Sequence, residues 1–268
     1  MAKELGVSRQ SLYYAPKLPA KDMALKTALT RVMDKNSAYG HKRLATELGI
    51  SKKRVRRVMK LFRLEVQRKR RKKPEKPEDR GIAAMNIPNR LTGKVINKPG
   101  MAWASDFTYL SFQGRFVYLA TVEDIFTRQI LGWTVSTRHN ADLVVSALLD
   151  ALGRNNKPQI FHSDQGSEYR SRLLLETLQR EQILPSMSKK ASPWQNGYKE
   201  SFYSQFKLEL GHPDSYGTMG ELVEGIALQI YYYNTRRIHT ALKCAPNVFA
   251  KRYEFNHLTM ANQKVLIV

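Results

Sequence analysis

The order of strand-like and helix-like segments constrains the fold of this chain more than any other feature. Residues 101–110, 115–122 and 130–137 alternate or run apolar, with many aromatic and β-branched side chains, which predicts three strands. Gln113 and Gly114, between the first two segments, predict a tight hairpin turn. Helical and strand-like segments then alternate: helix 141–152, strand 158–163, helix 171–182, strand 184–188, and helices 198–210 and 221–237. This order predicts an α/β fold with a mixed sheet flanked by helices.

Three acidic residues occupy distinctive places among these elements. Asp106 lies in the first strand, Asp164 directly follows the fourth strand, and Glu200 lies in the helix that follows the last strand. The chain places 35 residues between Asp164 and Glu200. Carboxylates are hard oxygen ligands of the kind that Mg²⁺ prefers. Two such ions roughly 4 Å apart can stabilise both the attacking and the leaving oxygen of a phosphodiester. A fourth acid, Asp124, is interpreted as structural.

The helix expected at residues 198–210 has two different sides. At about 100° per residue, Tyr198, Phe202 and Phe206 fall on one side, which is expected to be the buried face. The opposite side, expected to point away from this packing surface, carries Asn196, Glu200, Tyr203 and Lys207. This arrangement would deliver a carboxylate into a cleft beside a phosphate-binding lysine.

The residues around the three acids extend the pattern. They are Trp103-x-x-Asp106-x-Thr108-Tyr109, Ser163-Asp164-Gln165-Gly166-Ser167-x-Tyr169, and Glu200-Ser201-Phe202 with Lys207. These motifs resemble those of the insertion-sequence-three family of transposases, in particular their second reading-frame product, and the likeness runs from about residue 36 to residue 250. The resemblance implies a ribonuclease-H-like catalytic core with an acid triad of the retroviral-integrase type. It also implies DNA cleavage and strand transfer with two Mg²⁺ ions, for which Mn²⁺ can substitute, and with water or a DNA 3′-hydroxyl as the nucleophile.

The resemblance also suggests which residues contact DNA near the acids. Lys207 is expected to contact the DNA end, and Trp194 could stack on an unpaired base there. The segment Tyr233-Asn234-x-x-Arg237-x-His239 matches a family motif. The expected DNA-binding residues of this part of the chain are Trp194, Asn196, Lys199, Lys207, Arg237 and His239.

The N-terminal part contains the same short sequence motif twice, at residues 4–14 and 47–58. Each copy reads as a helix end, a glycine, an apolar residue, a serine N-cap and a basic helix. This is the second half of a helix-turn-helix. Segments 22–35 and 41–48 can supply the earlier helices of the second copy. Its expected DNA-binding residues are Lys52, Lys53, Arg54, Arg56 and Arg57. The first copy has no room for supporting helices, and the resemblance suggests that an upstream reading-frame product, or a fusion with it, supplies them.

Charge and composition restrict the possible partners and the cellular location of the protein. The formal charge is +22, which favours a polyanionic partner, here double-stranded DNA. Cys244 is the only cysteine, which excludes an internal disulfide and a cysteine-based zinc site. No apolar run is long enough for a membrane span or a signal peptide. We therefore expect a bacterial cytoplasmic protein associated with the nucleoid and acting as a homo-oligomer on DNA.

The expected organisation has five parts, and two other functions remain open. The parts are a partial helix-turn-helix at 1–19, a helix-turn-helix domain at 20–67, a basic linker at 68–95, a catalytic core at 96–250 and a tail at 251–268. One alternative is a catalytically silent DNA-binding regulator of transposition. The other is a ribonuclease-H-like nuclease without strand transfer.

Overall fold

The structure is a computed structural model that describes residue 6 and residues 17–66, 87–188 and 197–265, with side chains from 19–66, 87–188 and 201–257. The chain divides into two compact units, residues 1–68 and 69–268. The expected partial motif at 1–19 and the basic run at 68–73 lie almost wholly outside the described residues. Among the described helices, none combines the length and the apolarity that crossing a membrane would require.

The first unit contains three helices, α2 (Lys17–Lys35), α3 (His41–Glu47) and α4 (Lys52–Leu61). Gly49 adopts a φ of +62° in the turn between α3 and α4, which is a conformation that favours glycine. The Ser51 hydroxyl accepts a hydrogen bond from the Arg54 amide, so the expected N-cap is confirmed. The buried core of the unit comprises Leu25, Leu29, Ala38, Tyr39, Leu44, Ala45, Val55 and Val58.

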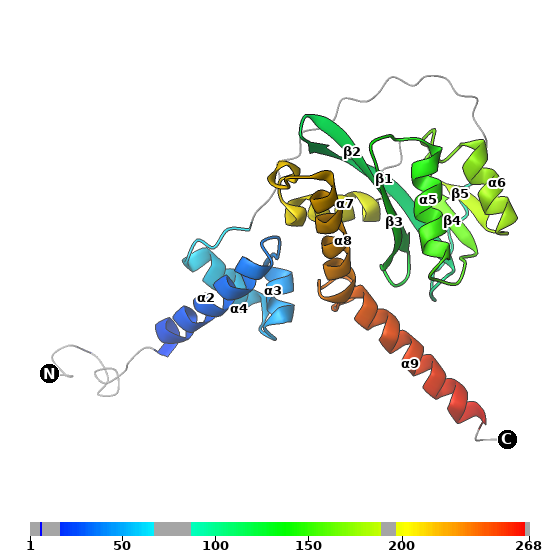
Figure 1. Cartoon of the computed structure of the whole chain (residues 1–268). Coiled ribbons are helices and arrows are strands. Elements are labelled where there is room, and N and C mark those ends of the chain that lie inside the picture. The colour runs from blue at the N-terminus through cyan, green and yellow to red at the C-terminus, as the bar shows by residue number, and fades with distance from the viewer. Residues whose placement is uncertain (1–5, 7–16, 67–86, 189–196, 266–268) are drawn as a thin grey trace. The chain divides into compact units, whose positions relative to one another are not determined.

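The second unit is built on a five-stranded sheet with the strand order β3-β2-β1-β4-β5 (Figure 1). Its strands are β1 (Ala102–Phe112), β2 (Arg115–Asp124), β3 (Ile130–Ser136), β4 (Ile160–Ser163) and β5 (Leu184–Met187). The first three strands are antiparallel, and β4 and β5 add parallel pairs. Gln113 and Gly114 turn the first hairpin with φ values of 47° and 73°. The mixed sheet and its hairpin are therefore as the sequence predicts.

Helices cover both faces of this sheet. They are α5 (Ala141–Leu152), α6 (Arg172–Arg180), α7 (Gly197–Leu210) and α8 (Met219–Thr235). Successive residues of β2 belong to different cores: Leu119 packs with α7 and α8, and Ala120 packs with α5 and α6. Because side chains alternate along a strand, the two cores lie on opposite faces. The core of the α7–α8 face is rich in aromatic residues, including Phe202, Phe206 and Tyr233.

One glycine sets the distance between β3 and α5. A Cβ atom at Gly132 would lie 2.4 Å from the Ala151 amide nitrogen and 2.5 Å from the Ala147 carbonyl oxygen. Any side chain at this position would clash with the backbone of α5. Strand and helix are therefore in direct backbone contact.

The last helix, α9 (Pro246–Val265), differs from expectation. The sequence predicts a tail that begins at residue 251, but α9 runs without a break across that position. The Phe126 ring packs against Phe249 on one side of the expected boundary and against Tyr253 on the other, with ring centroids 5.4 and 4.9 Å away. The aromatic contacts that hold the helix to the catalytic unit thus extend beyond residue 250.

Candidate active site

Asp106 lies in the middle of β1, at the centre of the sheet. Its side chain is half-buried, and its Oδ1 accepts a hydrogen bond from the Phe107 amide at 2.8 Å. The pairing between β1 and β4 ends at Ala104 and His162, so Asp106 follows directly where the two strands separate. The first strand of the sequence, which carries Asp106, is thus the central strand of the sheet.

Asp164 follows the last residue of β4. Its Oδ1 accepts a hydrogen bond from the Gly166 amide at 2.9 Å. Burial raises the pKa of this carboxyl above its usual value, and the hydrogen bond from Gly166 opposes the shift. The negative charge of Glu168 raises the pKa further, whereas the Arg170 guanidinium lowers it. The site thus holds an acid in surroundings that disfavour an isolated negative charge.

A buried tyrosine connects the segment after Asp164 to β1. The Tyr169 hydroxyl is 3.1 Å from the Ser105 hydroxyl on β1, and the ring is fully buried. Burial raises the pKa of Tyr169 well above its usual value, and the negative charges of Asp106 and Asp164 add to this shift. Both carboxylates therefore act on a single phenol, which indicates that the fold brings the two acids together.

Helix α7 carries Glu200 in its first turn; the side chain of Glu200 lies outside the described side chains. Three residues later, the Tyr203 hydroxyl donates a hydrogen bond to the Asp106 carbonyl oxygen at 2.5 Å and lies 2.8 Å from the Thr121 hydroxyl. Among the described side chains, no three of His, Cys, Asp and Glu form a cluster that could hold a metal ion. The contacts of Tyr203 nevertheless attach α7 to the strand that bears Asp106.

The prediction that Tyr203 points away from the packing surface of its helix is wrong. Its side chain is buried, like those of Phe202 and Phe206. The helix packs on α8 and also against β1, so it has two buried sides where the sequence pattern suggests one. Burial raises the pKa of Tyr203 well above its usual value, and the charge of Asp106 adds to the shift. This phenol therefore stays protonated and can donate its hydrogen bond.

Lys207 lies one turn farther along α7 than Tyr203. Its Nζ is 4.6 Å from the centroid of the Tyr109 ring on β1. Trp194 and Asn196 lie outside the described residues. Lys199 lies in α7, but its side chain lies outside the described set.

Arg237 and His239 follow α8, and both make contacts within the second unit. The Arg237 side chain is buried, and its Nε donates to both carboxylate oxygens of Glu209 at 2.7 and 2.8 Å. The guanidinium also donates to Gln205 of α7. His239 is half-buried, and its amide donates to the Cys244 carbonyl in the turn before α9. Arg237 thus connects α7 to the end of α8, a role that the sequence motif does not suggest.

The basic residues of α4 also differ from one another. Lys52, Lys53 and Arg56 are exposed and Arg54 is half-buried. Arg57 forms an ion pair at 2.5 Å with Asp22 of α2, whose side chain is 4% exposed. Arg57 therefore helps to fix the orientation of α4, although it is itself exposed, and all five side chains remain at least partly accessible.

Asp124 and Glu168 are two further buried acids of the second unit. Asp124 accepts hydrogen bonds from the amides of Gly100, Phe126 and Thr127. This confirms its interpretation as structural. Glu168, which no sequence pattern singles out, is buried, and its Oε1 lies 2.9 Å from His139 Nδ1. Only its place within the Asp164 motif could have pointed to it.

Comparisons with known proteins assign the family. Two models of the integrase core domain match residues 96–193 and 181–246. The transposase for insertion sequence element IS629 from Shigella sonnei is 30% identical over 239 residues, which cover 87% of this chain and 80% of that protein. The chain belongs to the insertion-sequence-three family of transposases.

Other relatives agree with this assignment. The transposase for element IS904 from Lactococcus lactis is 38% identical over 148 residues, which cover 54% of this transposase and 58% of that protein. A chain of the simian T-cell lymphotropic virus intasome, solved with the PP2A regulatory subunit B56 gamma, is similar in fold, with a TM-score of 0.52 at 15% identity. That match covers 83% of this transposase and 74% of the viral chain. The predicted ribonuclease-H-like integrase fold is confirmed.

Proposed function

We propose that this transposase cuts DNA at the ends of its insertion element and joins the cut strand to target DNA. Asp106, Asp164 and Glu200 would serve as the ligands of two divalent metal ions. The observations that carry the proposal are two contacts beside Asp106: Tyr169, from the segment that follows Asp164, contacts Ser105, and Tyr203, from the helix that bears Glu200, donates to the Asp106 carbonyl oxygen.

The donor set fits Mg²⁺, with Mn²⁺ as a substitute. Asp106 and Asp164 supply hard oxygen atoms, and burial of Asp164 disfavours its ionised form unless a positive charge lies nearby. Glu200 lies three residues before Tyr203, and positions three apart share a side of a helix. When bound, the ions would stabilise the attacking and leaving oxygens of the phosphodiester.

Other residues of the site would position the acids and the DNA. The hydrogen bond from Tyr203 to the Asp106 carbonyl fixes the distance between α7 and β1. Tyr169 fixes the Asp164 loop against β1 through Ser105. Lys207 lies where it would contact a phosphate of the bound strand, and Trp194, Asn196 and Lys199 are proposed to contact the same DNA. None of these groups needs to form a covalent bond to DNA.

The first unit would bind element DNA as a helix-turn-helix domain, with α4 as the recognition helix. Lys52, Lys53, Arg54 and Arg56 give α4 an exposed cationic surface, and the ion pair between Arg57 and Asp22 holds the helix on α2. Such a surface attracts DNA phosphates through counterion release.

Replacing Arg54 and Arg56 with glutamine should therefore weaken binding to duplex DNA. The slope of log K against log salt should fall by about 0.9 for each phosphate that the protein no longer neutralises. Fluorescence anisotropy at several salt concentrations measures both quantities. Lys94→Gln with Lys98→Gln, which removes the same charge from exposed positions of the second unit, is the matched control. An unchanged affinity and slope in the Arg54/Arg56 variant would show that α4 does not face the DNA.

We also propose that the transposase works as a homo-oligomer on paired DNA ends, with an upstream reading-frame product or a fusion with it. The fold neighbour comes from an intasome, and the resemblance to the insertion-sequence-three family suggests the upstream reading-frame partner.

The decisive experiment incubates the chain, alone and joined to the upstream product, with Mg²⁺ and labelled element ends. Joined products are expected, with more end-specific joining from the fused form. Cutting without joining would favour a nuclease, and binding without cutting would favour a regulator. Equal joining by the isolated chain would contradict the need for the upstream product.

A further inference from the structure

Two large aromatic rings are exposed on the sheet close to the acids. Tyr109 on β1 is 50% exposed and Phe116 on β2 is 55% exposed. Their ring centroids are 5.3 Å apart at an interplanar angle of 77°. The strand register pairs Tyr109 with Tyr118 and Ser111 with Phe116, so both rings project from the same face of the sheet. On the same face, two residues nearer the start of β1, Phe107 and its partner Ala120 belong to the core beneath α5.

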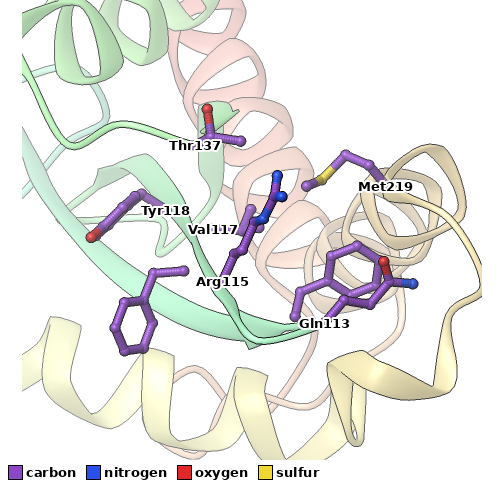
Figure 2. A pocket seen from close by; sticks show the side chains of 8 residues that line it. Gln113, Arg115, Val117, Tyr118, Thr137 and Met219 are labelled. Carbon is purple, nitrogen blue, oxygen red and sulfur yellow. The ribbon is translucent and has the colours of Figure 1, made fainter.

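Cationic side chains flank the two rings. Lys207 Nζ lies 4.6 Å from the Tyr109 centroid. On the other flank, the exposed Arg115 shares with Phe116 the lining of an open hollow of about 700 Å³. Figure 2 shows the Arg115 side chain between Tyr118 and Met219 at this hollow. Exposed aromatic rings between cations are the arrangement that binds single-stranded nucleic acid: the rings stack on bases and the cations bind phosphates.

The position of the rings relative to the acids is also suitable. Tyr109 is three residues beyond Asp106, about 10 Å along β1, so the two side chains leave opposite faces of the sheet. The Tyr109 ring nevertheless lies 4.6 Å from Lys207 Nζ of α7, the helix on the Asp106 side. Helix α7 runs alongside β1 between these two positions, because Tyr203 contacts Asp106 and Lys207 contacts Tyr109.

We propose that Tyr109 and Phe116 form a stacking platform for an unpaired base of the DNA strand, within a few nucleotides of the phosphate that reacts. Lys207 and Arg115 bind the phosphates on either side of that base. The proposal rests on the proposed function for the location of the reacting phosphate. It assigns to the hairpin a role in holding the strand apart from its complement.

The test is photocrosslinking of the full chain to element-end DNA that carries 5-iodouracil at successive positions in an unpaired flank. The reaction is done with EDTA, so its readout does not depend on catalysis. Crosslinks to Tyr109 or Phe116, located by mass spectrometry, are expected to be strongest at an unpaired position within a few nucleotides of the cleavage position. Crosslinks that map only elsewhere would overturn the proposal.

Variants give a second readout, the affinity for a single-stranded oligonucleotide at a salt concentration that suppresses ionic binding. Tyr109→Ala with Phe116→Ala should weaken binding roughly tenfold. Tyr109→Phe with Phe116→Tyr should restore it, because the rings are kept, whereas the paired leucine variants should not. Phe255→Ala, which removes a ring that is 70% exposed on α9, is the matched control. Far-ultraviolet circular dichroism verifies folding.

The outcomes separate this proposal from the proposed function. A chain that crosslinks at the rings but does not join DNA would contradict the function and leave the platform intact. A chain that joins DNA normally with both rings replaced, and whose affinity is unchanged, would overturn the platform alone. An altered oligomeric state in the alanine variant with unchanged DNA binding would show that the rings face another protein copy, which also overturns the proposal.

Discussion

Asparagine in place of Asp106 or Asp164 is expected to abolish DNA cleavage and strand transfer, with a loss of roughly a thousandfold or more, about 4 kcal/mol of transition-state stabilisation. A carboxamide is a poor replacement for an anionic ligand of Mg²⁺. Glu200→Gln should have the same effect. DNA affinity should remain nearly unchanged, because the proposed binding surfaces lie on other residues. Gel assays with labelled element ends measure both activities, and anisotropy measures binding.

Asp142→Asn provides the matched control for these substitutions. Asp142 is an exposed acid in the first turn of α5, and its replacement changes the net charge by the same amount. This variant should cut and join at the rate of the unaltered chain. Full activity in the variant of any one of the three acids would remove that acid from the mechanism.

Arg237→Ala is expected to lower the free energy of unfolding of the second unit by about 3–5 kcal/mol. The substitution leaves Glu209 as a buried carboxylate without its guanidinium partner, and it removes the link from α8 to Gln205 of α7. Urea unfolding, followed by a probe in the second unit, measures the change. The family motif suggests a DNA contact for this arginine, whereas its burial predicts a defect of stability.

The neighbouring arginine offers a direct comparison. Arg236 is exposed, so Arg236→Ala should change stability by less than about 0.5 kcal/mol. Glu209→Ala should destabilise the unit about as much as Arg237→Ala, because each leaves the other partner buried and unpaired. If Arg237→Ala weakened DNA binding without a loss of stability, the ion pair would not explain the place of this residue in the motif.

The parts of the fold that follow from local pattern could be predicted from the sequence. The alternation of residues 101–137 and the Gln113-Gly114 turn specify the hairpin strands, because each strand has a definite inner and outer face. Spacing and flanking residues single out Asp106 and Asp164. These features depend on neighbours in the sequence or on the positions of strand ends.

The features that could not be predicted depend on contacts between distant elements. A helical periodicity identifies the most apolar side of α7, but Tyr203 is buried by β1, whose position no periodicity encodes. The ion pair between Arg237 and Glu209 joins two helices, and a motif shows residue types without their partners. The continuation of α9 past residue 250 depends in the same way on Phe126, which lies far away in the sequence.

The contact between Gly132 and the backbone of α5 has a mechanical consequence. Because no side chain separates β3 from α5, these elements cannot slide past one another without a steric clash, and the sheet with its two acids behaves as a stiff block. Helix α7 is joined to that block through side chains alone, by the Tyr203 hydroxyl and the aromatic core. Side-chain contacts deform more easily than abutting backbones. Helix α7, which bears Glu200, is therefore the part of the site that moves more easily. When a DNA end binds, Glu200 is expected to shift, while Asp106 and Asp164 keep their positions.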